Sequence, residues 1–301
     1  MKGFASWISV ILLSDKYHYL LTPPLLFCSM KKHFLIIFSI IFAAFVLSGC
    51  GEDSVSPVNN TPEEYVKVVS AEKDNIRFEI WTTGNDTLMT GYNKVGFKVF
   101  ENGQAKSSGS VKFYAKMFHF SSTEYHATPV EPEYLYDNSV GMFTGYIIML
   151  MPSDTSSRWY GFYSYNDDLR VDSARFDVGW DNLTKFKIFT DLQTNLSYLI
   201  TMTSPQVPVR GFNDFICMLH ESPDFLNFTQ VNSASMFLRV RLDSLNHNSS
   251  DNINPVYTSG GFYKGRVNFD YGGGWKVYDS IYYNNTNITN YGTPYIYYNV
   301  P

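Results

Sequence analysis

The chain has 301 residues, of which 45% are hydrophobic and 17% aromatic, and its formal net charge is −5. This length accommodates one large domain or two domains of ordinary size, either of which can bury a hydrophobic core. The acidic balance and the lack of any Lys/Arg cluster exclude nucleic acid from the expected partners.

The first predicted element is a lipoprotein signal peptide at residues 30–49. Two lysines follow Met30, an apolar run extends from Phe34 to Leu47, and the sequence LSGC ends at Cys50. This order is that of a secretory signal peptide. The closing LSGC resembles the bacterial lipobox, in which the cysteine is acylated and becomes the first mature residue. An uncleaved anchor helix that ends by chance at a cysteine is the alternative. Because Met30, followed by two lysines, is the better translation start, we interpret residues 1–29 as the result of a start codon assigned too far upstream.

A polar tether is predicted at residues 50–64, where prolines, asparagines and acidic residues would hold the folded part away from the membrane. Of the three cysteines, Cys28 lies in the leader and Cys50 is the predicted lipid site. Because acylation would occupy the Cys50 thiol, Cys217 remains alone, and no intrachain disulfide is available to the mature domain. Because Cys217 lies in the apolar stretch FICML, we expect an inert, buried thiol. A reactive or metal-binding cysteine is the alternative.

From residue 65 onward, the chain consists of short runs in which apolar and polar residues alternate. Examples are VGFKVF, SVKFYAKMFHF, SASMFLRVRL and GRVNFDY. These runs are rich in Tyr, Phe, Val, Ile and Thr and are separated by Gly, Asn, Asp, Ser and Pro, which is typical of β-strands. Short strands at regular spacing predict an all-β fold of the immunoglobulin-like β-sandwich type.

The strand pattern occurs twice. TGYNKVGFKVFENG corresponds to RGFNDFICMLHESP, so that Gly91 matches Gly211 at an offset of 120. Further matches in the same order are Gly145 with Gly265, His126 with His247, Pro129 with Pro255, and Trp159 with Trp275. They predict a tandem duplication, with one sandwich at residues 65–182 and the other at 183–301. The tryptophan of each copy is expected to fill the core between sheets. Chance similarity among aromatic strands is the alternative.

Both copies share a Gly-aromatic-Asn strand opening, a loop that ends in Pro, a Gly-containing strand and a following Trp. The matching pieces are Gly91-Tyr92-Asn93, Met117 to Pro129, Gly145-Tyr146 and Trp159, then Gly211-Phe212-Asn213, His247, Pro255, Gly265 and Trp275. In this arrangement the chain resembles the YtkA/FixH-like group of small envelope β-sandwich modules. The resemblance implies a link to copper handling and to the assembly of respiratory oxidases. The second copy departs from it, because Leu238 and Val240 lie near the places of Met117 and His119.

The stretch KMFHFSSTEYHATP contains the best candidates for a metal site. On a strand, Met117 and His119 project to the same face, and His126 follows in a loop that can fold back. Thioether and imidazole ligands suit copper, above all Cu(I). Met149 and Met151 share a face of a later strand and complete the candidate set. The alternative is structural, because methionine fills gaps in cores and a hydrogen-bonded histidine is commoner than a ligand.

The chain carries no HExxH, no GxSxG elbow and no Walker loop. We therefore expect a non-enzymatic lipoprotein of the cell envelope, periplasmic or surface-facing, that acts by binding or scaffolding. Its expected partners are the membrane, through the lipid on Cys50, and another envelope protein. A copper-delivery protein is the alternative, while an enzyme acting on carbohydrate or peptide has no supporting constellation. The Tyr-rich stretches EYLYD, WYGFYSY and YIYYNV fit either a recognition surface or half-buried strands.

Overall fold

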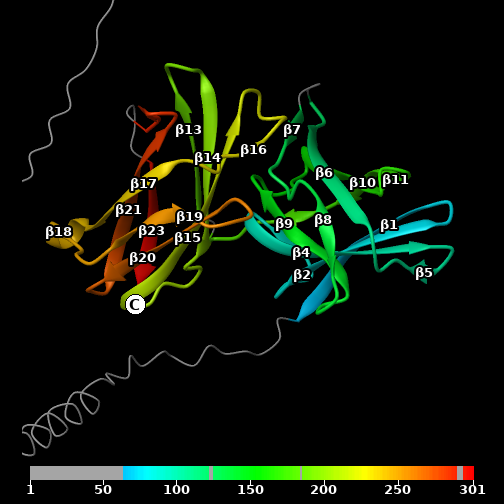
Figure 1. Cartoon of the computed structure of the whole chain (residues 1–301), viewed down its shortest axis with the longest axis horizontal. Coiled ribbons are helices and arrows are strands. Elements are labelled where there is room, and N and C mark those ends of the chain that lie inside the picture. The colour runs from blue at the N-terminus through cyan, green and yellow to red at the C-terminus, as the bar shows by residue number, and fades with distance from the viewer. Residues whose placement is uncertain (1–63, 122–124, 184, 290–293) are drawn as a thin grey trace, which may run out of the picture. The chain divides into compact units, whose positions relative to one another are not determined.

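The computed structural model describes four stretches of the chain, residues 64–121, 125–183, 185–289 and 294–301. All of them belong to the compact unit Pro62–Pro301. The expected signal peptide, Cys50 and the leader of residues 1–29 lie outside the described residues, as does the expected tether apart from Glu64. Regular structure in the described stretches is almost entirely β-strand (Figure 1). The predicted all-β class is therefore confirmed.

The strands divide into two consecutive groups along the chain. Those of the first half are β1 (Tyr65–Lys73), β2 (Ile76–Thr83), β3 (Leu88–Met89), β4 (Gly91–Glu101), β5 (Gln104–Ala105), β6 (Ser110–His119), β7 (Tyr125–Ala127), β8 (Tyr134–Asp137), β9 (Met142–Met149), β10 (Ser157–Tyr165), β11 (Leu169–Phe176) and β12 (Val178–Gly179). Those of the second half, with the short 3-10 helix η1 (Asp243–Leu245), are β13 (Phe186–Asp191), β14 (Leu196–Ser204), β15 (Gly211–Ser222), β16 (Thr229–Gln230), β17 (Ser235–Leu242), β18 (His247–Asn248), β19 (Ile253–Tyr257), β20 (Phe262–Phe269), β21 (Gly273–Tyr283), β22 (Thr286–Asn287) and β23 (Tyr295–Val300). Within the described stretches, no helix has the length and apolar character needed to cross a membrane.

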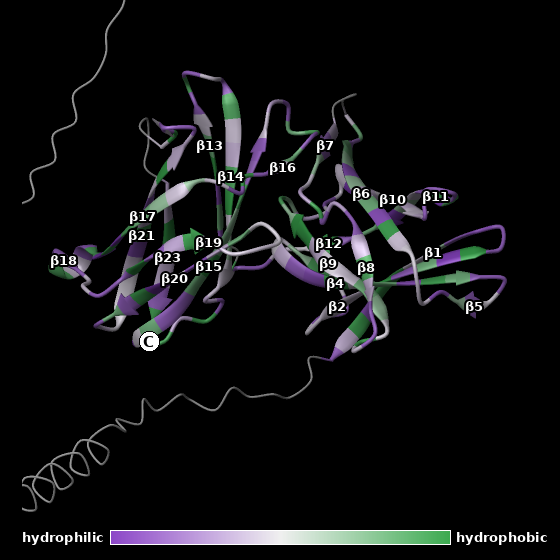
Figure 2. Cartoon of the chain, viewed as in Figure 1, coloured by the Kyte–Doolittle hydropathy of each residue, from purple (hydrophilic) through white to green (hydrophobic). Residues whose placement is uncertain are grey.

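The first half is built on one sheet that closes around its own core. Hydrogen-bonded neighbours follow the order β1-β2-β4-β9-β8-β6-β10-β11, and the end strands β1 and β11 contact each other. Along β10, every second residue is buried, and Figure 2 shows hydrophilic and hydrophobic residues alternating along the strands. Phe97, Phe113 and Tyr163 form mutual ring contacts on the inner face. The alternation seen in the sequence thus encodes one buried and one exposed face.

The second half consists of two sheets. One has the order β13-β14-β15-β20-β19, and the other has the order β18-β17-β21-β22, with β23 paired to β21. Their inner faces bury one continuous cluster of apolar side chains. Because this cluster is separate from that of the first half, each half has a core of its own. The boundary expected between residues 182 and 183 stays a prediction, with which the two cores agree.

The match between Gly91 and Gly211 has a common structural basis. These glycines open β4 and β15 with φ of +94° and +95°, a conformation that glycine adopts without steric cost. Two residues later, Asn93 and Asn213 fold their side chains back on the chain. In both cases Nδ2 donates to the glycine carbonyl at 2.9 Å, and Oδ1 accepts a backbone N–H at 2.9 Å. The two strands therefore begin with the same hydrogen-bonded turn.

The glycines in the middle of the partner strands also occupy equivalent places. Val95 lies opposite Gly145 in the β4–β9 pair, and Phe215 lies opposite Gly265 in the β15–β20 pair. An added Cβ would lie 2.6 Å from the Tyr134 ring at Gly145 and 2.4 Å from a backbone oxygen at Gly265. A neighbouring segment thus approaches too closely for any side chain. Equal register and equal steric demand support the predicted duplication.

The two tryptophans have the core role expected of them. Trp159 in β10 and Trp275 in β21 are fully buried. Each indole N–H donates to a backbone carbonyl at 2.9 Å, that of Met151 in the first half and that of Tyr271 in the second. Both large side chains are therefore buried without an unsatisfied polar atom.

The register corrects one part of the sequence alignment. In equivalent register positions, Met117 lies opposite Trp159 and His126, and Leu242 lies opposite Trp275 and His247. Leu242 therefore takes the place of Met117, and the alignment of Met117 and His119 with Leu238 and Val240 is wrong. The cause is the longer connection between β15 and β17, which shifts β17 along the sequence relative to the constant offset.

Candidate functional site

A contact surface between the two halves positions the candidate site. Its apolar part is a cluster of four buried side chains, Tyr146, Ile148, Leu199 and Met218. Its polar part centres on the Tyr146 hydroxyl, which accepts a hydrogen bond from Gln230 Nε2 at 2.7 Å and lies 3.1 Å from His220 Nε2. Burial lowers the pKa of His220 to about 3. At neutral pH the imidazole is therefore uncharged, and its Nε2 can accept a hydrogen bond from the Tyr146 hydroxyl.

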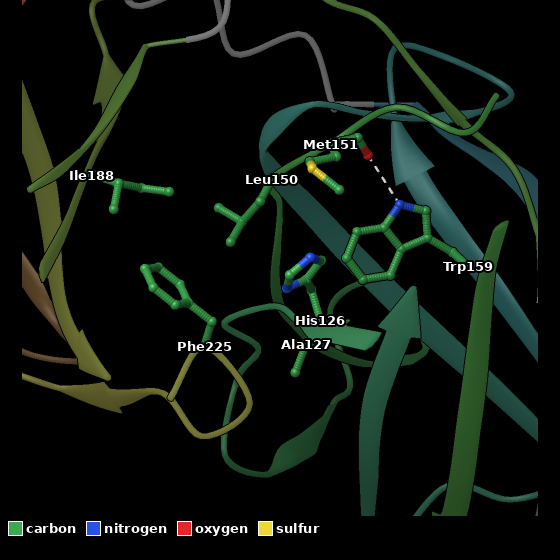
Figure 3. Close-up of a pocket in the computed structure, with 7 residues that line it drawn as sticks. All are labelled: His126, Ala127, Leu150, Met151, Trp159, Ile188 and Phe225. Carbon is green, nitrogen blue, oxygen red and sulfur yellow. Dashed lines mark hydrogen bonds between the residues drawn. The ribbon is translucent and has the colours of Figure 1, made fainter. Parts of the chain in front are cut away.

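An apolar cavity of about 350 Å³ lies where the two halves meet. The first half contributes His126, Ala127, Leu150, Met151 and Trp159, and the second contributes Ile188 and Phe225. In Figure 3, Ile188 and Phe225 lie on one side and Met151 and Trp159 on the other, with Leu150 and His126 between them. The volume is in the usual range of small-molecule pockets, which are mainly apolar with few polar groups. In this cavity the His126 imidazole supplies the polar group of the wall.

Phe225 is held in the cavity wall by an unusual backbone conformation. Its φ is +58°, in the left-handed region that bulky residues rarely adopt. Ser222 Oγ accepts the Phe225 N–H at 2.9 Å, and the Phe225 carbonyl accepts the N–H of Ala127 at 3.0 Å. Asp224 Oδ1 accepts two further backbone N–H groups of the same loop at 2.9 Å. Backbone strain of this kind is concentrated at ligand sites and is kept only where surrounding bonds enforce it.

The structure brings three of the five predicted metal-site residues together. His126 and Met151 line the cavity, and the ring centroids of His119 and His126 are 5.3 Å apart. Met117 and Met149 are instead fully buried in the core of the first half. Among the described residues, no group of three or more His, Cys, Asp and Glu is placed to hold a metal ion. A copper site here would therefore need a thioether ligand, and the metal assignment stays a prediction.

Sequence reasoning missed most of the cavity wall. Ile188 and Phe225 are in the second half, more than sixty residues from His126, and neither belongs to a motif. Leu150 belongs to an ordinary apolar stretch at the end of β9, and Ala127 is a small residue at the end of β7 with no functional group of its own. A side chain's position across a contact between two halves is set by tertiary packing, which leaves no local pattern in the sequence.

Cys217 lies in the core of the second half, away from this cavity. It is fully buried, and its Sγ is 3.7 Å from the Sδ of Met236. Burial raises the pKa of the Cys217 thiol well above its usual value, so the thiol form dominates and reactivity is low. The predicted burial of this cysteine is confirmed.

No family model matches the chain, and no curated protein matches its sequence. One solved structure with some similarity is that of FdeC, described as a broadly conserved Escherichia coli adhesin. The two chains are 10% identical with a TM-score of 0.24, and the match covers 77% of this chain. It spans 66% of the adhesin chain, slightly less than two thirds of its length. A similarity of this size carries no conclusion about function.

Proposed function

We propose that the protein is a lipid-anchored binding protein of the cell envelope, periplasmic or surface-facing, and that the cavity between its halves is the binding site. Cys50 in its lipobox-like setting supports the anchor, and the membrane is then one partner. The observation that supports the binding site most is the strained Phe225, held over an apolar cavity that residues of both halves line. The proposed role is non-enzymatic binding.

The occupant proposed for this cavity is an apolar or aromatic group, such as an anchoring side chain of another envelope protein. Burying such a group stabilises a complex by about 1.5–3 kcal/mol, and single buried anchors often dominate protein interfaces. His126 can orient the occupant with one hydrogen bond. The hydrogen bonds that hold Phe225 in place lower the entropic cost of binding.

A charge at the cavity wall tests this site. Ile188 is 42% exposed on an edge strand, so Ile188→Arg should leave the fold intact while placing a cation against the occupant. We expect residues 52–301 to bind one molecule of the neutral fluorophore N-phenyl-1-naphthylamine, and the variant to bind it at least about tenfold more weakly. Fluorescence titration measures both affinities.

Leu192→Arg is the matched control, because Leu192 follows the same strand, is 65% exposed and does not line the cavity. It should bind the fluorophore as the wild type does. Equal binding by wild type and Ile188→Arg would remove the cavity from consideration as the binding site.

Copper binding is the second candidate function, and the approach of His119 to His126 beside Met151 favours it. It is also the role that membership of the YtkA/FixH-like group would imply. We expect residues 52–301 to bind one Cu(I), and His126→Ala to lose that binding, because imidazole and thioether are both soft enough for this ion. Competition with a chromogenic Cu(I) chelator measures the affinity.

His247→Ala is the control for copper, since His247 has the equivalent register position in the second half and pairs with Asp270 at 2.8 Å. This variant should retain the ion. A wild-type protein that takes no stoichiometric Cu(I) or Cu(II) would end the copper-delivery hypothesis.

A further inference from the structure

The sheet of β17, β21 and β23 turns one face away from the core of the second half. Along these strands buried and accessible residues alternate, and the buried apolar ones belong to the core around Trp275. Four large rings on the accessible face are between 37% and 54% exposed. A solvent-facing strand position ordinarily carries a polar residue, so the rings on this face are more than the fold requires. With the less exposed Tyr278, they are Phe237, Tyr282, Tyr295 and Tyr297.

Three cations share this face with the rings. Arg239 and Arg241 project from β17 and Lys276 projects from β21, whereas the carboxyl group of these strands, that of Asp279, is buried in the core. Arg241 and Lys276 both pair with Asp243, which directly follows β17, at 2.8 and 2.6 Å. Among the described residues, Arg239 has no ion-pair partner. The face therefore keeps a positive charge, although the formal net charge of the chain is −5.

The cations lie against the rings. The guanidinium carbon of Arg239 is 4.5 Å from the centre of the Tyr278 ring, and Lys276 Nζ is 5.0 Å from the centre of the Tyr295 ring. Lys187 Nζ, from the edge strand β13, approaches the same Tyr295 ring to 5.4 Å. Such contacts hold the long side chains along apolar surface while their charged ends stay in water. The three strands thus present one mixed aromatic and cationic surface.

This combination of groups matches the surface of an anionic lipid bilayer. Tyrosine joins an apolar ring to a polar hydroxyl, and it is enriched where the hydrocarbon of a membrane meets the headgroups. A guanidinium such as that of Arg239 can bind a lipid phosphate through two parallel hydrogen bonds. We propose that the outer face of β17, β21 and β23 docks on an anionic membrane. The rings enter the headgroup region, and the cations pair with the acidic lipids around them.

The length of chain between the proposed lipid and the folded part brings such a membrane within reach. Thirteen residues, 51–63, separate Cys50 from the first described residue. Fully extended, they span at most about 50 Å. A face held this close meets the bilayer at an effective concentration on the order of millimolar, so that a modest affinity is sufficient. This step rests on the lipid proposed for Cys50, whereas the argument from rings and charge does not.

The test measures how residues 52–301 sediment with lipid vesicles. This segment contains the whole compact unit but lacks Cys50. We expect it to bind vesicles made of equal parts phosphatidylcholine and phosphatidylglycerol, and to bind them less as NaCl screens the charges. Arg239→Gln should weaken this binding about fivefold. Phe237→Ser combined with Tyr297→Ser should weaken it by about tenfold or more, because two rings no longer leave water.

Two variants on the opposite sheet are the matched controls. Arg266 also lies over an exposed ring, that of Phe212 at 4.3 Å, but it projects from β20. Tyr257 is an exposed tyrosine on β19. Arg266→Gln and Tyr257→Ser should therefore bind the vesicles as the wild type does. Circular dichroism shows whether each variant keeps its strands.

Three results would overturn the proposal. The first is a wild-type protein that does not bind the anionic vesicles, and the second is undiminished binding by the folded outer-face variants. The third is binding to soluble polyglutamate without binding to vesicles, which would assign the face to an acidic macromolecule. Because the tested segment lacks Cys50, vesicle binding can succeed or fail independently of the proposed anchor, and the fluorophore titration tests the cavity separately.

Discussion

Replacing Asp279 with asparagine should raise the free energy of unfolding at pH 8 by roughly 5 kcal/mol. Asp279 projects from β21 into the core of the second half, where it is 1% exposed and its Oδ1 has no hydrogen-bond partner among the described residues. Burial raises the pKa of this carboxyl from 3.8 to about 8. The folded protein therefore keeps a proton that the unfolded chain has already released.

The sign follows from proton linkage. Because the pKa of Asp279 is higher in the folded state, its stabilising effect is complete below pH 3.8 and is lost as the pH rises to about 8. Urea unfolding at about pH 4 should thus give equal stability for wild type and Asp279→Asn, with the gap widening up to about pH 8. His220 acts in the opposite direction, because its pKa is lowered in the folded state. The contribution of His220 is the same in wild type and variant, so it cancels in the difference between their free energies of unfolding. A constant difference across this pH range would contradict the prediction.

Trp159→Ala should lower the free energy of unfolding by about 3–5 kcal/mol, and Trp275→Ala by a similar amount. Each indole is fully buried, and its removal leaves a cavity and an unpaired backbone carbonyl. Replacement by phenylalanine should restore part of the stability, because the ring fills much of the space while the N–H is missing. Urea denaturation followed by circular dichroism gives the values.

Trp180→Ala is the matched control, since Trp180 is 61% exposed and its indole N–H donates to the exposed Asn182 side chain. Its effect should stay within about 0.5 kcal/mol. Comparable loss in the control and in the two core variants would mean that neither tryptophan fills a core in solution.

The sequence predicts best what depends on local backbone demands. The match of Gly91 with Gly211 could be recognised in the sequence because a positive φ selects glycine at both positions. The match of Gly145 with Gly265 could be recognised because a neighbouring segment leaves no room for a Cβ atom at either position. These constraints persist in both copies even where surrounding side chains differ. The alternation of polar and apolar residues likewise follows directly from the pleat of a strand.

The candidate site was only partly predictable, for a physical reason. His119 and His126 are near in sequence and meet across a hairpin, so their proximity follows from strand pairing. Met117 and Met149 turned out to be fully buried core residues. The alternation of polar and apolar residues alone cannot distinguish a methionine that packs in the core from one that binds a metal. Phe225 and its loop reach the cavity through contacts between halves, which no periodicity encodes.

The matching turns and registers of β4–β9 and β15–β20 also bear on how the chain reaches its native state. A nascent β15 can offer β9 the same hydrogen-bond spacing that β4 offers, so exchanged partners are close competitors. The native pairing is then favoured over the exchanged one by the fit of the side chains around the central glycines and by the fit of each strand to the core of its own half. Because the two halves are so similar, a strand of one half can pair during folding in the place of the equivalent strand of the other half, which would trap the chain in a misfolded state.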